Sequence, residues 1–336
     1  MSIKSYRQAI NETLFEEMRR DERVVIMGED IAGGAGCAGE DDAWGGPLGV
    51  TAGLVGEFGR GRVLDTPLSE AGFIGAAAGA AISGMRPIAE LMFVDFFGVC
   101  FDAIYNQAAK FRYMFGGGVS CPLVIRTTIG AGMRTAAQHS QSLYSLFTHV
   151  PGLKCVAPSS PYEAKGLLAQ AIADDDPVIF FEHKLMYDMT EEVPDERYLI
   201  PFGEANIMRD GEHVTIVAIS RMVHVALEAA EALAGEGVEC EVIDPRSLSP
   251  LDADTIIESV EATGRLVIVD EDTPRCSLAA DIAATVADEA FTALTAPIKR
   301  VNAPHCPVPF TGALEDLYIP NAAKVAAAVR AVMEAG

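Results

Sequence analysis

Basic residues are scarce in this chain of 336 amino acids. Lys and Arg total 25 against 48 Asp and Glu, so the formal net charge at pH 7 is −23. A protein that binds nucleic acid needs a basic face to neutralise phosphates, and anionic membrane surfaces also attract basic segments. The composition therefore argues against nucleic acid and against a membrane surface as partners.

Long hydrophobic runs and paired cysteines are also lacking. The longest stretch of small apolar residues, Ala71–Met85, is rich in Gly and short for a membrane span. The N-terminal segment is charged throughout and has no apolar core of a secretory signal. The seven cysteines are scattered without a C-x-x-C pair, which predicts neither a disulfide framework nor a zinc site. We expect free thiols and a cytoplasmic protein.

The chain is rich instead in short aliphatic runs that alternate with longer segments of helical periodicity. Aromatic residues make up only 7%, so we expect cores built from Ala, Val, Leu, Ile and Gly, with close backbone approaches. This alternation is typical of βαβ units with mostly parallel sheets, and we predict an α/β protein with helices flanking its sheets. The predicted strands are Val24–Met27, Val63–Asp65, Ile88–Leu91, Leu123–Thr127, Cys155–Ala157, Val178–Phe181, Val214–Ile219, Cys240–Ile243, Leu266–Val269 and Ile298–Val301. The predicted helices are Tyr6–Arg20, Glu70–Ser83, Asp102–Phe115, Pro161–Ala173, Met222–Ala234, Ala253–Ala262, Leu278–Leu294 and Asn321–Met333.

The pattern lapses between Lys184 and Gly203. This stretch is acidic, contains two prolines and shows no sustained period, as expected of a connection between domains. We predict a first domain over residues 1–185, a linker over 186–203 and a second domain over 204–336.

One glycine motif has the spacing of a dinucleotide-binding loop but not the sequence context. Gly34–Gly39 reads G-x-G-x-x-G after a strand, which is the spacing of a dinucleotide-binding loop. Such a loop should open an apolar helix, but three carboxylates at 40–42 follow and would repel a pyrophosphate. We do not assign a nicotinamide site here.

Four residues occupy positions where chemistry could occur, and each also has an ordinary structural explanation. His139 lies in the small, polar segment 137–142 between a strand end and a helix start, where α/β sheets often place ligands. Its imidazole could move protons near neutral pH, although a lone histidine is usually just a hydrogen-bonded residue. Glu70 starts a Gly/Ala-rich helix, where the macrodipole alone favours a carboxylate. Glu29 ends a strand with the same ambiguity, and Phe96 is by default a core aromatic.

Eight segments, taken in their order and spacing, resemble the β subunit of the thiamin-diphosphate-dependent decarboxylating component of 2-oxo acid dehydrogenase complexes. They are Arg62–Glu70, Asn106–Met114, Ala137–Gln141, Pro151–Lys154, Asp176–Lys184, Val242–Arg246, Ser249–Asp252 and Thr263–Leu266. Further segments are similar to the acetoin branch of this family: Gly39–Gly46, Asp270–Cys276, Ala303–Phe310 and Leu314–Pro320. The resemblance spans nearly the whole chain.

The resemblance implies a β chain with a pyrimidine-binding domain and a transketolase C-terminal domain in an α2β2 heterotetramer. Thiamin diphosphate would lie between α and β subunits, with its Mg²⁺ held by the α subunit, since this chain lacks the family's G-D-G motif. By position, Glu70 matches the carboxylate that binds N1′ of the aminopyrimidine, and Phe96 the aromatic residue that packs on that ring. His139 matches the active-site histidine near the substrate, and Glu29 an acidic residue between paired active sites.

The resemblance also implies a structural potassium ion. Its ligands would be mainly backbone carbonyls of Leu123, Ala171, Asp174 and Asp176. Oxygen ligands suit a hard monovalent cation, although an acidic loop is the simpler interpretation of these residues.

The implied activity is cleavage of acetoin to acetaldehyde, with transfer of the acetyl unit to a lipoyl-bearing acyltransferase. A β subunit acting on pyruvate or a branched-chain 2-oxo acid is the alternative. Two other hypotheses remain open at this point: a transketolase-like half-enzyme without a lipoyl partner, and a scaffold whose acidic surface holds a basic domain of the acyltransferase core.

Overall fold

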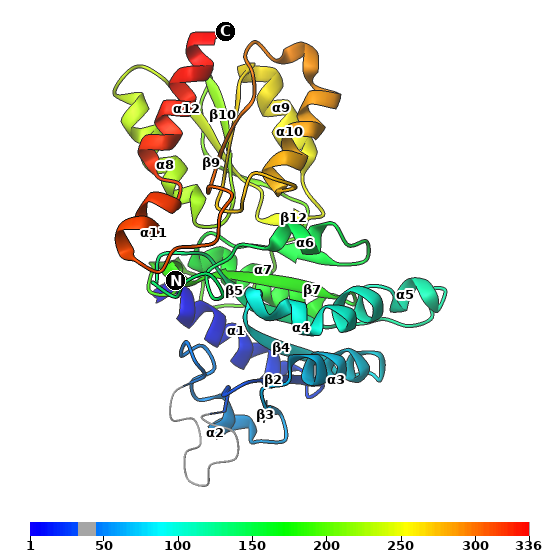
Figure 1. Cartoon of the computed structure of the whole chain (residues 1–336). Coiled ribbons are helices and arrows are strands. Elements are labelled where there is room, and N and C mark those ends of the chain that lie inside the picture. The colour runs from blue at the N-terminus through cyan, green and yellow to red at the C-terminus, as the bar shows by residue number, and fades with distance from the viewer. Residues whose placement is uncertain (33–44, 336) are drawn as a thin grey trace. The chain divides into compact units, whose positions relative to one another are not determined.

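The computed structural model describes residues 1–32 and 45–335, which fall into two compact units (Figure 1). The first unit comprises Met1–Ile129 and Leu146–Phe202, and the second comprises Gly130–Ser145 and Gly203–Gly336. The segment Gly130–Ser145, which carries His139, thus packs within the second unit, although the chain on both sides of it belongs to the first.

A parallel sheet forms the centre of the first unit. Its strands run in the order β6-β7-β5-β4-β2-β3 and all pair in parallel. Parallel strands buried on both faces read as continuous aliphatic runs, which is why the sequence revealed them. Their bounds are β2 Val24–Gly28, β3 Val63–Asp65, β4 Arg86–Phe93, β5 Val124–Ile129, β6 Lys154–Val156 and β7 Val178–His183.

Helices flank this sheet. Helices α1 and α7 pack against each other, and α3 packs against both β4 and α4. Ser5 opens α1 with a capping box shared with Gln8, and Ser160 caps α7 ahead of Pro161 in its first turn. The helical segments are α1 Tyr6–Arg20, α2 Leu54–Phe58, α3 Glu70–Ile82, η1 Val94–Phe96, α4 Phe97–Asp102, the π-helical η2 Ala103–Ala108, α5 Phe111–Met114, α7 Pro161–Ala173 and η3 Lys184–Met186. Helix α6, Tyr144–Thr148, begins on the last two residues of the segment Gly130–Ser145 of the second unit and ends in the first unit.

Two short strands were not predicted. Strand β1, Ser2–Ser5, pairs antiparallel with β8, Thr190–Val193, which lies inside the stretch that sequence analysis treated as a linker. Strand β8 has an exposed, acidic sequence, so its extended backbone comes from pairing with β1 rather than from its own pattern.

One charged cluster is buried in the first unit. The Arg126 guanidinium on β5 donates to Glu182 at 2.7 and 2.8 Å and to Glu90 at 2.7 Å. The Tyr187 hydroxyl also donates to Glu182 at 2.7 Å. Burial and these hydrogen bonds tie strands β4, β5 and β7 together across the sheet.

The second unit is another α/β layer structure. Its sheet has the order β14-β13-β10-β11-β9, parallel except for β9 at the edge. Figure 1 shows α8 and α12 on one face of this sheet and α9 and α10 on the other. The elements are β9 Asn206–Arg209, β10 Val214–Ala218, α8 Met222–Ala234, β11 Cys240–Asp244, β12 Ser247–Ser249, α9 Ala253–Thr263, β13 Leu266–Asp270, α10 Leu278–Glu289, η4 Phe291–Ala293, β14 Lys299–Asn302, α11 Gly312–Tyr318 and α12 Ala322–Ala335.

The predicted α/β class, with mostly parallel sheets flanked by helices, is confirmed. In the described part of the chain, no helix is both long and apolar enough to span a bilayer.

Candidate functional site

Three of the predicted site residues lie at one edge of the first unit's sheet. Glu29 directly follows β2, Glu70 begins α3 after β3, and Phe96 ends the short turn η1 after β4. Strand β2 lies between β3 and β4, and all three are parallel, so the residues that follow them emerge at the same edge. This is the edge at which open α/β sheets place ligands.

Backbone and side-chain hydrogen bonds hold this edge together. The Thr66 N–H donates to the Gly28 carbonyl at 2.9 Å, which continues the pairing of β2 and β3 past the strand ends. The Ala32 N–H donates to the Asp65 carboxylate at 2.6 Å. The segments that carry Glu29 and Glu70 are therefore linked to each other on both sides.

Glu29 and Glu70 form an electrostatic pair. Glu29 is only 7% exposed, and its Oε1 atom has no hydrogen-bond partner among the described residues. Burial raises the pKa of Glu29, and the charges of Glu70 and Asp30 raise it further. Burial likewise raises the pKa of Cys100 to about 12, with a contribution from Glu70. A ligand that donates a proton here would give Glu29 Oε1 a hydrogen bond and would weaken the repulsion between the carboxylates of Glu29 and Glu70.

Phe96 adds an aromatic wall at the same edge. Its half-buried ring meets Phe93 edge to face, with ring centroids 5.6 Å apart. An aromatic side chain beside two carboxylates can hold a flat, nitrogen-containing ring by its face while the carboxylates contact its edge.

His139 belongs to the second unit, on the segment Gly130–Ser145. His139 is half-buried. The Thr135 hydroxyl donates to the His139 carbonyl at 3.1 Å and lies 2.8 Å from the Ser140 hydroxyl. The Gly130 N–H donates to the Gln141 carbonyl at 3.2 Å and closes the segment into a loop. The backbone around His139 is therefore fixed by its own polar groups.

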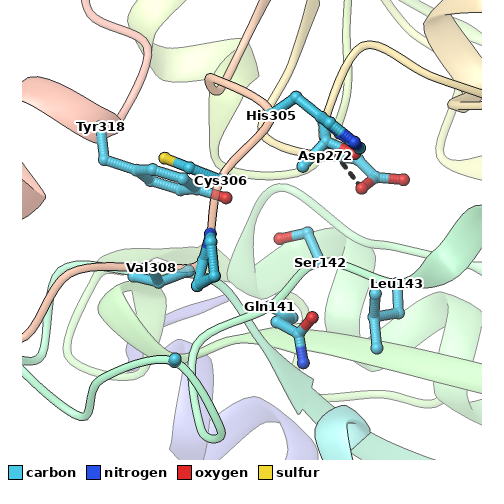
Figure 2. Close-up of a pocket in the computed structure, with 11 residues that line it drawn as sticks. Gln141, Ser142, Leu143, Asp272, His305, Cys306, Val308 and Tyr318 are labelled. Atoms are coloured by element: carbon cyan, nitrogen blue, oxygen red, sulfur yellow. Dashed lines mark hydrogen bonds between the residues drawn. The ribbon is translucent and has the colours of Figure 1, made fainter.

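A cavity of about 470 Å³ borders this loop within the second unit. Figure 2 shows Gln141, Ser142 and Leu143 on one side of the cavity, with Asp272 and His305 on the other. Ala137 and Gln141, which flank His139 in sequence, both line it. The Ser142 hydroxyl is buried and has no hydrogen-bond partner in the described part of the chain.

Sequence reasoning missed Asp272 in this cavity. The residue is 8% exposed, and burial together with the neighbouring charge of Asp270 raises its pKa to about 7. Its Oδ2 accepts a hydrogen bond from the Ser145 hydroxyl at 2.5 Å. The acidic triplet 270–272 directly after an aliphatic strand was the available signal, because residues that follow a parallel strand gather at a sheet edge.

The four residues implied as potassium ligands fall around one loop of the first unit. Leu123 directly precedes β5, Ala171 lies in the last turn of α7, and Asp174 and Asp176 lie between α7 and β7. The Lys154 ammonium contacts the Asp174 carboxylate at 2.7 Å and that of Asp176 at 3.4 Å. Within residues 1–32 and 45–335, no group of three or more His, Cys, Asp or Glu side chains is arranged to bind a metal.

The motif Gly34–Gly39 and most of the segment Gly39–Gly46 lie outside the described residues. The assignments based on them therefore rest on sequence alone.

Comparison with known domain families defines the class of protein. Residues 3–189 match the model of the transketolase pyrimidine-binding domain, and residues 203–325 match that of the transketolase C-terminal domain. A solved split-gene transketolase, described as an inactive β4 tetramer, shares the fold, with a TM-score of 0.78 at 24% identity over 98% of both chains.

Curated relatives narrow this class to one family. The chain is 64% identical to the β subunit of acetoin:2,6-dichlorophenolindophenol oxidoreductase of Cupriavidus necator, over 99% of this chain and 98% of the relative. It is 60% identical to the subunit of the same name in Bacillus subtilis, over 96% and 95%. The pyruvate dehydrogenase E1 β subunit of Rickettsia felis is 47% identical over 97% of both chains. The chain belongs to the family of β subunits of the thiamin-diphosphate-dependent acetoin and 2-oxo acid dehydrogenases.

Proposed function

We propose that this chain is the β subunit of an acetoin dehydrogenase and that it acts in an α2β2 heterotetramer. The observation that carries the proposal is that the buried Glu29 and the half-buried Glu70 and Phe96 emerge at one edge of the sheet of a pyrimidine-binding domain. The identity of 64% to a named acetoin oxidoreductase β subunit, against 47% to a pyruvate dehydrogenase β subunit, favours acetoin as the substrate.

The residues at this edge fit an aminopyrimidine. Glu70 would hold the proton shared with ring atom N1′, and the unsatisfied Oε1 of Glu29 supplies the negative field that keeps a proton in this place. Phe96 would pack on the ring face. Thiamin diphosphate, when bound, supplies the electron sink for the carbanion that is left when the C–C bond of acetoin breaks.

His139 would serve as the acid and base on the substrate side. Cleavage of acetoin to acetaldehyde and an acetyl unit requires removal of the carbinol proton, and passing the acetyl unit to a lipoyl group requires protonation of the released thiolate. An imidazole exchanges protons efficiently near neutral pH, and one half-buried in a fixed loop is suited to both steps.

The partners and ions follow from the same family assignment. The α subunit would hold the diphosphate and its Mg²⁺, and a lipoyl-bearing acyltransferase would accept the acetyl unit. A potassium ion would bind the carbonyls of Leu123, Ala171, Asp174 and Asp176. Lys154 and Arg112 neutralise the carboxylates of this loop, which favours backbone oxygens as the ligands. The Asp174 carbonyl also accepts a hydrogen bond from Arg86 at 2.6 Å, so the ion would use its second lone pair.

The test is an assay of the reconstituted heterotetramer with thiamin diphosphate and Mg²⁺. Reduction of 2,6-dichlorophenolindophenol should be much faster with acetoin than with pyruvate or 3-methyl-2-oxobutanoate. Glu70→Ala should abolish turnover while the heterotetramer stays intact by size-exclusion chromatography, and Glu22→Ala, an exposed carboxylate of the same unit, should have no effect. A preference for either oxo acid would refute the substrate, and near-normal turnover of Glu70→Ala would refute the site.

The physiological acceptor needs a separate measurement. In the absence of a dye, acetylation of an added lipoyl domain should depend on His139 and on acetoin. Formation of a free product at an undiminished rate without any lipoyl domain would instead indicate a transketolase-like enzyme.

A further inference from the structure

Two buried carboxylates hold the start of the loop that carries His139. The Ala131 N–H donates to Glu271 Oε1 at 2.6 Å, and the Gly132 N–H donates to Glu315 Oε1 at 2.7 Å. Glu271 is 5% exposed and Glu315 is completely buried. These contacts connect residues 140 and 183 positions apart in sequence, so the start of the loop is anchored to the residue directly after β13 and to α11, in addition to its own internal hydrogen bonds.

The far end of the loop is held in the same way. The Tyr144 hydroxyl donates to the buried Asp270 carboxylate, and the Ser145 hydroxyl donates to Asp272 at 2.5 Å. His139 therefore lies between two sets of carboxylate anchors, both supplied by the second unit.

Glu315 contacts the loop at two residues. Besides Gly132, its Oε2 accepts from the Arg134 backbone N–H at 3.2 Å and from Arg134 Nη1 at 2.6 Å. Arg134 has φ of 58° and Gly132 has φ of 110°, so both residues are in left-handed conformations that a non-glycine side chain disfavours. Such a backbone persists only where its surroundings hold it, and here one carboxylate accepts three hydrogen bonds from the two residues.

The contact is separate from the main core of the second unit. Ala131 packs with Ala303, Val308 and Tyr318 in a small cluster that is distinct from the larger cluster around β10 and α8. The partly buried Ile319 packs against both clusters. A change at Glu315 should therefore shift the loop without unfolding the sheet.

We propose that Glu315 is a positioning residue for His139. It acts through the loop: its charge fixes the left-handed turn at Gly132 and Arg134, and the turn sets the place of the imidazole. The inference rests on the proposed role of His139 in proton transfer, and it assigns a functional effect to α11, an element that contributes nothing to the predicted site.

The experiment compares Glu315→Gln with Asp316→Asn in the reconstituted heterotetramer. Asp316 is the matched control because it pairs with the same Arg134, at 2.7 Å, but its side chain is 64% exposed and its contact is with the Arg134 guanidinium rather than with the loop backbone. The amide of glutamine places a donor where Arg134 also donates. We expect kcat for acetoin to fall about 10- to 100-fold for Glu315→Gln and to be unchanged for Asp316→Asn.

Two further measurements distinguish positioning of His139 by Glu315 from a general contribution of Glu315 to the structure. Binding of thiamin diphosphate, measured calorimetrically, should be unchanged in Glu315→Gln, because the proposed pyrimidine contacts belong to the first unit. In a His139→Ala background, Glu315→Gln should cause no further loss of kcat. Additive losses in the double variant, or equal effects of Glu315→Gln and Asp316→Asn, would overturn the proposal.

A second variant covers the case in which Glu315→Gln does not fold. Thr135→Val keeps the side-chain shape and removes the hydroxyl that contacts the His139 carbonyl and Ser140. It should reproduce the drop in kcat, again without effect in the His139→Ala background. If His139→Ala itself retains full turnover, the proposed function fails. If His139→Ala is inactive while Glu315→Gln and Thr135→Val both have normal turnover, only this inference fails.

Discussion

Asp272 should make the second unit less stable as the pH rises, and Asp272→Asn should remove this dependence. The carboxyl is buried beside Asp270, and its pKa is raised to about 7 from an ordinary value of 3.8. The folded state therefore favours the neutral acid. Stabilisation by the proton is complete below about pH 4 and is lost as the pH rises through about 7, because the unfolded chain ionises freely over that range.

The magnitude follows from the two pKa values. A difference of about three pKa units corresponds to about 4 kcal/mol of destabilisation once Asp272 is ionised in both states. Between about pH 5 and about pH 8 the change is about 3 kcal/mol, since part of the loss has already occurred at pH 5. For a unit of this size, this difference corresponds to a Tm shift of about 5–10 °C.

The measurement is the Tm of wild type and of Asp272→Asn at several pH values, taken as a difference so that titrating groups remote from Asp272 cancel. The Tm of Asp272→Asn relative to that of the wild type should rise by about 5–10 °C between about pH 5 and about pH 8. Asp288→Asn, an exposed carboxylate on α10, is the control and should show a constant difference. A pH-independent difference for Asp272→Asn would refute the assignment of a raised pKa to this buried acid.

Two other predictions concern the first unit. Replacing Arg126 by Met leaves the carboxylates of the buried Glu182 and the largely buried Glu90 without their cation. It should cost about 3–5 kcal/mol in denaturant unfolding, whereas Arg19→Met, at an exposed ion pair, should have no measurable effect. If the two variants are equally stable, the cluster does not hold the sheet together. Potassium should raise the Tm relative to choline at equal ionic strength, and equal values would argue against an ion at the loop 174–176.

The repeating elements were accessible from sequence alone. The strand Val63–Asp65 and the helices Pro161–Ala173 and Met222–Ala234 have the bounds that their apolar patterns predicted. These elements are buried on an extended face, so their side-chain period records their structure directly. The edge position of Glu29, Glu70 and Phe96 follows in turn, because residues after neighbouring parallel strands must emerge together.

Elements whose backbone depends on a distant partner were missed. Strands β1 and β8 lie near opposite ends of the first unit's sequence and pair with each other. Neither strand has an apolar pattern that would predict it. The segment Asp102–Phe115 was predicted as one helix but contains the end of α4, a π-helical turn and α5. The π-helical turn packs against α3, and that contact is invisible to a pattern read along one segment.

The sequence by itself determined the α/β class, the parallel strands and the family, because each depends on residue patterns that repeat along the chain. Only the tertiary structure showed that the loop of His139 belongs to the second unit and is held by Glu271 and Glu315. It alone showed Asp272 as an acid with a pKa near 7. The physical reason is that propensity and periodicity act between residues a few positions apart. Burial, charge proximity and hydrogen-bond geometry depend instead on which distant segments meet, and an acidic residue looks the same in sequence whether it is exposed or enclosed.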